Sequence, residues 1–128
     1  MQHVGVDLIE VDRIQQALER WGERFLMKVY TEAERTECRG KPSRLATRFA
    51  AKEAVMKALG TGAKGVSWRE IEVLSHRSGA PYIRLHGRAQ ARAERLGLTS
   101  LAVSMSDSRD SAVAMVVGEG PSPQGKHT

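Results

Sequence analysis

Residues 48–62 combine one carboxylate with several cations on a segment that favours helix. The run Arg-Phe-Ala-Ala-Lys-Glu-Ala-Val-Met-Lys-Ala-Leu-Gly-Thr-Gly is rich in strong helix formers and ends in glycines. Its single acid is Glu53, and four cations lie nearby in sequence: Arg44, Arg48, Lys52 and Lys57. A carboxylate among cations at the border of a buried helix face suits a divalent metal and a polyphosphate. The spacing also fits an ordinary amphipathic helix with a Glu53–Lys57 pair four residues apart, so the segment alone leaves both interpretations open.

A second acid, Asp7, lies far from Glu53 in sequence, within a segment patterned as a strand. Val4, Val6 and Leu8 alternate there with Gly5 and Asp7. Aspartate is unfavourable in strands, so we interpret Asp7 either as the N-cap of the following helix or as a ligand. Gly5 beside it would let another backbone or a substrate approach closely.

Periodicity and capping signals predict an α+β domain in which a long helix packs on an antiparallel sheet. Strands are expected at 3–8, 69–75, 81–86, 101–106 and 111–117, and helices at 11–20, 22–29 and 87–96. A further helix begins after Thr31, whose capping-box partner is Glu34, and the long helix runs from a cap at Ser43 to Leu59, followed by a flexible loop over 60–65. We expect residues 1–118 to form one domain and residues 119–128 to form a disordered tail.

Charge and composition favour a soluble protein with an anionic partner. The net charge is +5, which suits nucleic acid, an acidic protein or a phosphorylated small molecule. Only 5% of residues are aromatic, so a small core would gain from contacts between subunits. The single cysteine, Cys38, cannot form an internal disulfide and is expected to be a half-buried free thiol in the reducing cytoplasm. The sequence has no apolar run of about 20 residues, so no membrane association is expected.

Two separated segments together resemble a known family. They are the opening Gly5-Val-Asp-Leu-Ile-Glu-Val-Asp-Arg-Ile and the run 48–62, and both are similar to the holo-acyl-carrier-protein synthases, the short bacterial branch of the phosphopantetheinyl transferases. The resemblance extends over residues 3–117. It implies the 4'-phosphopantetheinyl transferase fold and a homotrimer with active sites at the subunit interfaces. It also implies Mg²⁺-dependent transfer of 4'-phosphopantetheine from coenzyme A to a serine of apo-acyl carrier protein, in support of fatty acid biosynthesis.

The resemblance also assigns roles to residues of this chain. Asp7 and Glu53 would hold Mg²⁺ and are catalytic together with Lys57, which would neutralise the departing phosphate or stabilise the transition state, with a proton-donor role as a further alternative. The remaining phosphates of coenzyme A would contact three cations: Arg44, Arg48 and Lys52. Gly60 and Gly62 would admit the pantetheine or adenine end. Asp107 stands where many relatives have histidine, so it would either orient a water or a coenzyme group or serve as a turn residue.

In the family that the two segments resemble, a basic first helix binds the acidic carrier protein, and the resemblance implies the same role here. Arg13, Arg20 and Arg24 match that role, with Phe25 as an apolar anchor or, alternatively, as a core residue. Two other functions remain as alternatives: a basic nucleic-acid-binding module and a metal-dependent phosphohydrolase. The first lacks a recognised motif and a run of exposed aromatic residues, and it leaves Asp7 and Glu53 without a role, so no nucleic-acid partner is expected.

Overall fold

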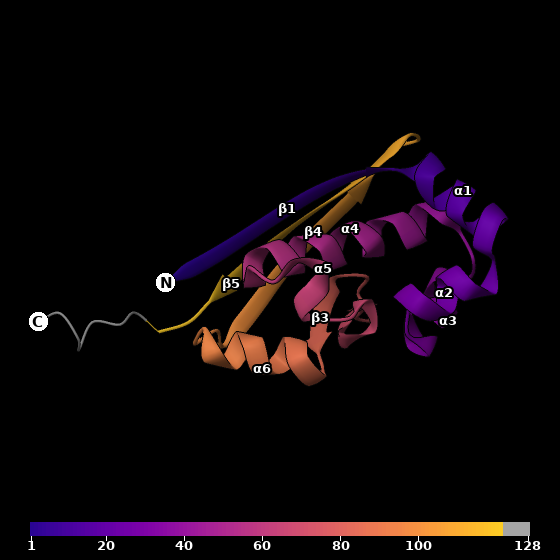
Figure 1. The fold of residues 1–128 in the computed structure, drawn as a ribbon. Coiled ribbons are helices and arrows are strands. Elements are labelled where there is room, and N and C mark those ends of the chain that lie inside the picture. Colours follow the sequence, from indigo (N-terminus) through magenta and orange to yellow (C-terminus); the bar gives the residue numbers. More distant parts are fainter. Residues whose placement is uncertain (122–128) are drawn as a thin grey trace, which may run out of the picture.

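The computed structural model describes residues 1–121, apart from the side chain of residue 63, and has the predicted α+β architecture (Figure 1). In chain order the elements are β1 (Gln2–Glu10), α1 (Val11–Trp21), α2 (Glu23–Val29), α3 (Glu32–Cys38), α4 (Pro42–Leu59), α5 (Gly62–Gly65), the 3₁₀ turn η1 (Trp68–Glu70), β2 (Ile71–Ser75), β3 (Pro81–Leu85), α6 (Gly87–Arg95), β4 (Ser100–Asp107) and β5 (Ser111–Glu119). The strands form two antiparallel sheets, β1-β5-β4 and β2-β3. None of the helices in residues 1–121 has the length and apolarity needed to cross a membrane.

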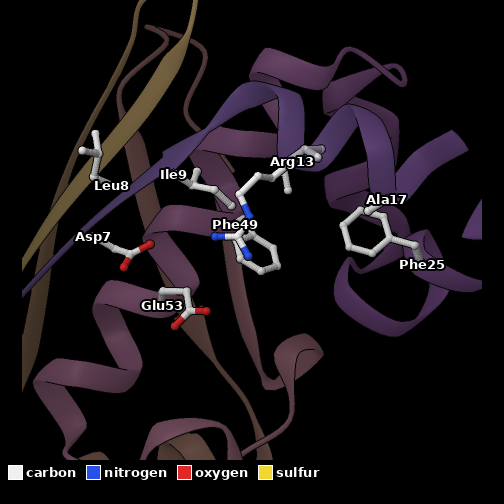
Figure 2. Close-up of a pocket in the computed structure, with 9 residues that line it drawn as sticks. Asp7, Leu8, Ile9, Arg13, Ala17, Phe25, Phe49 and Glu53 are labelled. Carbon is white, nitrogen blue, oxygen red and sulfur yellow. The ribbon is translucent and has the colours of Figure 1, made fainter. Parts of the chain in front are cut away.

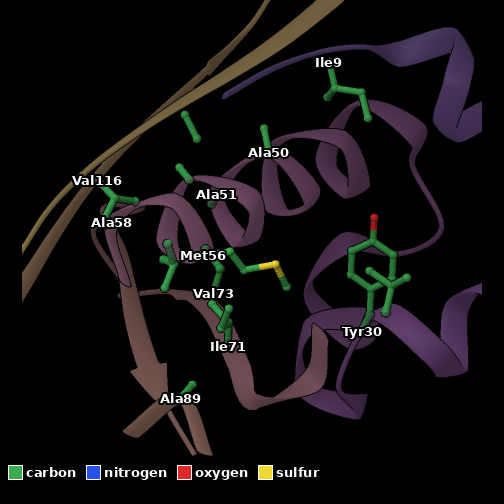
Figure 3. Packing of buried hydrophobic residues seen from close by; sticks show 14 of the residues in the cluster. Ile9, Tyr30, Ala50, Ala51, Met56, Ala58, Ile71, Val73, Ala89 and Val116 are labelled. Atoms are coloured by element: carbon green, nitrogen blue, oxygen red, sulfur yellow. The ribbon is translucent and has the colours of Figure 1, made fainter. Parts of the chain in front are cut away.

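The long helix α4 lies between the three-stranded sheet and the smaller β2-β3 sheet (Figures 1 and 3). It is buried around most of its circumference, because three consecutive residues, Ala50, Ala51 and Lys52, are all inaccessible and point about 100° apart. An amphipathic helix with one apolar stripe would not show this pattern. Met56 packs on the side of Ile71 and Val73 of β2, away from the three-stranded sheet.

Gly5 lets the three-stranded sheet approach α4 very closely. A Cβ atom placed on Gly5 would lie only 1.8 Å from the carbonyl oxygen of Ala54 and 3.0 Å from the backbone nitrogen of Ala58. The small alanines of this helix face therefore meet a strand position that carries no side chain at all. This contact positions the next inward-facing residue of β1, Asp7, beside the helix turn that carries Glu53.

The side of the three-stranded sheet that faces away from α4 is apolar and exposed. Five large hydrophobic side chains lie on it, each at least 36% exposed; we call this set the outer face: Val4, Val6, Leu8, Val113 and Met115. They are neighbours across the β1–β5 ladder, where Val6 pairs with Met115 and Leu8 with Val113. Neighbouring exposed apolar side chains of this kind are typical of a protein–protein interface.

Three local predictions need correction. Lys41, not Ser43, occupies the N-cap of α4, because Pro42 takes the first helical position, where its missing N–H costs nothing. The segment expected to be a flexible loop contains the short helix α5. The tail was predicted to begin at residue 119, but Glu119 pairs with Gln2 at the end of β5; residues 122–128 lie outside the described part of the chain. The capping box of Thr31 and Glu34 is confirmed.

Candidate active site

Asp7 and Glu53, 46 positions apart in sequence, line the same surface pocket (Figure 2). The pocket has a volume of about 350 Å³, and we call it the carboxylate pocket; its walls are Asp7, Leu8, Ile9, Arg13, Ile14, Ala17, Phe25, Phe49 and Glu53. β1 supplies Asp7 because alternate residues of that strand face α4, and α4 supplies Glu53. The interpretation of Asp7 as the N-cap of α1 is not supported, since Glu10 occupies that position.

The charges around the two acids are arranged for a cation. Burial and the neighbouring Asp7 carboxylate both raise the pKa of Glu53, and Lys57 only partly offsets them. The Lys57 ammonium donates to Asp7 Oδ1 at 3.0 Å and to the Val6 carbonyl oxygen at 2.9 Å. Within residues 1–121 these bonds use two of its three N–H donors. Two repelling carboxylates beside an anchored ammonium form a site that a divalent cation and a phosphate would stabilise.

A second surface groove begins where the carboxylate pocket ends, and Phe25 lines both. We call it the carrier groove; its volume is about 300 Å³ and its walls are Trp21, Arg24, Phe25 and Lys28. Trp21 is 49% exposed, and the guanidinium groups of Arg20 and Arg24 lie over its ring at 5.1 and 5.9 Å from the centroid. The groove therefore combines exposed aromatic surface with a cluster of positive charge.

Arg44 and Arg48 do not reach the carboxylate pocket of their own chain. Arg44 lies nine positions before Glu53 and Arg48 lies five positions before it, which turns both side chains more than about 130° away around α4. Arg48 donates instead to Ser75 Oγ at 3.1 Å and lies 3.7 Å from Glu37. The exposed Arg44 donates to the Glu37 carbonyl oxygen at 3.5 Å.

The structure corrects the prediction that Lys52 binds phosphate. Its side chain is fully buried and forms an ion pair of 2.8 Å with Glu34, which is also fully buried. The side chain precedes Glu53 by one residue, or about 100° of helix, which directs it into the core. Burial lowers the pKa of Lys52, and the paired Glu34 carboxylate acts in the opposite direction.

The other predicted coenzyme-binding positions lie on separate surfaces. Gly60 ends α4 in the left-handed conformation and lines a groove beside α6 with Arg88, Arg92 and Arg95, while Gly62 begins α5. Arg92 donates to the Leu59 carbonyl oxygen at 2.9 Å and so caps the end of α4. Asp107 is exposed at the end of β4, two strands away from β1.

Sequence reasoning missed two aromatic residues at the site. Trp21 could have been recognised, because a tryptophan between Arg20 and Arg24 at a helix end carries both signals of a docking surface. Phe49 lines the carboxylate pocket and stacks on Trp68 with centroids 4.7 Å apart, and no signal in the sequence separates it from the other apolar residues of α4. Cys38 is fully buried rather than half-buried, and burial raises the pKa of its thiol to about 11, as is typical of a structural thiol.

Comparison with known proteins identifies the family. The model of the 4'-phosphopantetheinyl transferase superfamily matches residues 3–116. The chain is similar to a holo-[acyl-carrier-protein] synthase of Herpetosiphon aurantiacus, with 55% identity over 91% of this chain and 97% of that relative. It is also similar to the crystal structures of holo-[acyl-carrier-protein] synthases from Neisseria meningitidis (36% identity, 91% of this chain and 97% of that one, TM-score 0.84) and Helicobacter pylori in complex with coenzyme A (31%, 91% and 99%, 0.83). The chain therefore belongs to the 4'-phosphopantetheinyl transferase superfamily, among the holo-[acyl-carrier-protein] synthases.

Proposed function

We propose that this protein transfers 4'-phosphopantetheine from coenzyme A to a serine of apo-acyl carrier protein in the carboxylate pocket. The observation that carries this proposal is the meeting of Asp7 and Glu53, from distant parts of the chain, beside the anchored ammonium of Lys57. A related structure holds coenzyme A, which supports the same co-substrate here. Modified carrier protein of this kind serves fatty acid biosynthesis, and the free thiol of Cys38 suits the reducing cytoplasm.

The donor set of the pocket fits Mg²⁺. Residues 1–121 contain no cluster of three or more metal-ligating side chains, but Mg²⁺ usually takes one or two carboxylates and completes its shell with phosphates and waters. Asp7 and Glu53 would supply those carboxylates, and their mutual repulsion favours a cation between them. When bound, Mg²⁺ would neutralise phosphate charge and orient the pyrophosphate of coenzyme A.

The proposed reaction requires this chain mainly to position the two substrates and to neutralise charge, and no side chain needs to form a covalent bond with them. The serine oxygen of the carrier forms a bond to the phosphorus next to the pantetheine arm, while the bond from that phosphorus to the bridging oxygen breaks. The proton of the serine hydroxyl passes to solvent, and adenosine 3',5'-bisphosphate departs with the bridging oxygen of the pyrophosphate. Lys57 would stabilise the charge that develops on the phosphate oxygens, and its bonds to Asp7 and to the Val6 carbonyl oxygen, which hold the ammonium beside Asp7, support that role.

The carrier protein would dock on α1 and α2, along the carrier groove. Acyl carrier proteins are acidic, and Arg20, Arg24 and Lys28 offer the opposite charge around the exposed ring of Trp21. Phe25 continues this surface into the carboxylate pocket, which Arg13 also lines. A carrier bound in the groove would thus present its serine to Asp7 and Glu53.

A homotrimer with composite sites explains the residues that lie apart in one chain. The outer face is a contiguous apolar surface on β1 and β5, and trimer contacts would bury it. None of three predicted coenzyme-binding residues, Arg44, Arg48 and Asp107, lines the carboxylate pocket of its own chain. In a trimer with composite sites they would contact the coenzyme bound to a neighbouring subunit. Lys52 cannot take part, since its ammonium is enclosed within its own chain.

Mass spectrometry of the carrier protein tests the proposed reaction. Incubation with Mg²⁺, coenzyme A and an apo carrier should add one phosphopantetheine to the carrier, and the Asp7→Asn and Glu53→Gln variants should lose this product. Release of adenosine 3',5'-bisphosphate from an unmodified carrier would indicate a phosphohydrolase. Nucleic-acid binding without either product would indicate a binding module and overturn the proposal.

A further inference from the structure

The buried ammonium of Lys52 is fully satisfied by partners from other elements. It bonds to Glu34 Oε1 at 2.8 Å, to the Trp68 carbonyl oxygen at 3.0 Å and, in a short contact, to the Ile71 carbonyl oxygen. These acceptors belong to α3, to η1 and to the first residue of β2. An ammonium has three N–H donors, so every donor is used.

Glu34 is held just as completely. Its Oε1 also accepts from the Thr31 backbone N–H at 2.8 Å, and its Oε2 accepts from the Val73 backbone N–H at 2.8 Å. Thr31 Oγ1 donates to Glu72 Oε2 at 2.6 Å, and Glu72 Oε1 lies 3.0 Å from His86 Nε2. The ion pair is therefore the inner end of a polar network that joins α4 to α3 and to the small β2-β3 sheet.

Stability alone does not account for this ion pair. Removing two charges from water is costly, and a buried pair often contributes no more than apolar side chains of similar volume. The face that α4 turns toward the three-stranded sheet carries small alanines such as Ala50, Ala51 and Ala54, which lie within about 100° of one another and interlock with their neighbours less than large side chains do. The directional hydrogen bonds of Lys52, on another side of α4, add a constraint on the rotation of the helix about its own axis.

The residue after Lys52 is Glu53, so the rotation of α4 sets the direction of the carboxylate. With Lys52 bonded in the core, Glu53 points about 100° further around the helix, into the pocket shared with Asp7. We propose that Lys52, paired with Glu34, is a positioning residue that fixes the rotation of α4 and thereby directs Glu53 toward Asp7. This inference rests on the proposed function for its link to Mg²⁺, and on the geometry alone for the placement of Glu53.

The decisive variant replaces both partners at once. Lys52→Met with Glu34→Leu removes the two charges, roughly keeps the side-chain volume and leaves neither charge buried alone. Manganese binding, followed by electron paramagnetic resonance in the presence of coenzyme A, reports the carboxylate site without any turnover. We expect the Mn²⁺ dissociation constant of the folded double variant to rise at least about tenfold. Thermal unfolding checks that the variant is folded at the assay temperature, because the backbone partners of both side chains lose a hydrogen bond. Ile71→Val, a small core change beside the network, is the control and should leave Mn²⁺ affinity unchanged.

A second measurement separates this inference from the proposed function. Cysteines at positions 7 and 53 can be bridged by a short bifunctional thiol reagent, and the buried thiol of Cys38 should not compete. The double replacement should lower the yield of this cross-link several-fold, whether or not the protein binds metal or coenzyme A. Unchanged cross-linking and unchanged Mn²⁺ affinity would overturn the positioning role. If the double variant fails to fold, Glu34→Gln is measured in the same two ways, with wild-type values again overturning the positioning role. This substitution removes the charge and the acceptor that faces the Val73 N–H, while its amide oxygen can still accept from Lys52 and Thr31.

Discussion

Replacing Gly5 with alanine tests whether close contact between β1 and α4 assembles the site. The added Cβ would lie 1.8 Å from the Ala54 carbonyl oxygen and 3.0 Å from the Ala58 nitrogen. Both are backbone atoms of a helix buried on most sides, so no side-chain rotation relieves the overlap. An ordinary contact begins at 3.4 Å, so strand and helix must separate by about 1.6 Å.

That separation should affect both stability and rate. Overpacking of a core costs about 1–3 kcal/mol, and a clash between main chains belongs at the upper end, so the unfolding midpoint should fall by about 10 °C. A misplacement of about 1 Å can cost about 100-fold in rate, and here it parts Asp7 from Glu53. We therefore expect carrier modification at 20 °C, where the variant remains folded, to slow by about 100-fold, with a higher Mg²⁺ requirement.

Gly118→Ala provides the matched control within the same sheet. A Cβ on Gly118 would lie 3.0 Å from Leu101 Cδ2 and 3.1 Å from Leu98 Cδ1, which are side-chain ends that can turn aside. Its unfolding midpoint should fall only slightly and its rate should remain near that of the wild type. Thermal unfolding and mass-spectrometric rate measurements on both variants decide the matter. Equal midpoints and equal rates for the two would refute the role assigned to Gly5.

Four further predictions follow from the site and the outer face. Lys57→Ala should lower kcat more than it weakens coenzyme A binding, because the ammonium stabilises charge that develops in the transition state. A weaker affinity for coenzyme A with an intact kcat would instead make Lys57 a phosphate ligand in the ground state. In metal-free protein, Glu53→Gln should raise the unfolding midpoint at pH 7 but not at pH 4. The pKa of Glu53 is raised in the folded protein, so ionisation of Glu53 lowers the stability at a pH above that raised pKa. This loss of stability is absent below the ordinary pKa of 4.5, where Glu53 is protonated in both states. Arg24→Glu should raise the KM for the carrier and leave that for coenzyme A unchanged, with a weaker salt dependence than the wild type; identical carrier titrations at two salt concentrations would contradict docking there. Met115→Glu, on the outer face, should reduce the mass measured by light scattering from about three times 14.1 kDa to one chain, and an unchanged trimer would place the interface elsewhere.

The sequence was sufficient to predict the elements with strong local signals. The capping box at Thr31, the alternation in β1 and the glycine after Leu59 are all short-range features, and the elements formed at or near their predicted bounds. The pairing of Asp7 with Glu53 was predictable only through two motifs taken together, because no local pattern reports which strand will pack on which helix.

The sequence did not reveal which cations would face the solvent. Lys52 and Lys57 are equally charged members of one helix, yet one is enclosed by Glu34 and the other remains 54% exposed beside Asp7. The difference depends on α3 and β2, whose positions are set by tertiary packing. Lys52 was predicted to contact a phosphate of coenzyme A, whereas the β2-β3 sheet covers that side of α4 and encloses the side chain.

The neighbouring positions of Lys52 and Glu53 also restrict how the length of this protein can change. Lys52 lies in the buried interior, and Glu53 lines the surface pocket. Inserting or deleting a single residue between Lys52 and Lys57 would therefore turn the rest of α4 by about 100° and leave Lys57 directed away from Asp7. The hairpin tip at 76–80 carries no such coupling and can absorb added residues. Variation in length should therefore collect in the hairpin, and these turns of α4 should keep a fixed residue count for as long as the site works.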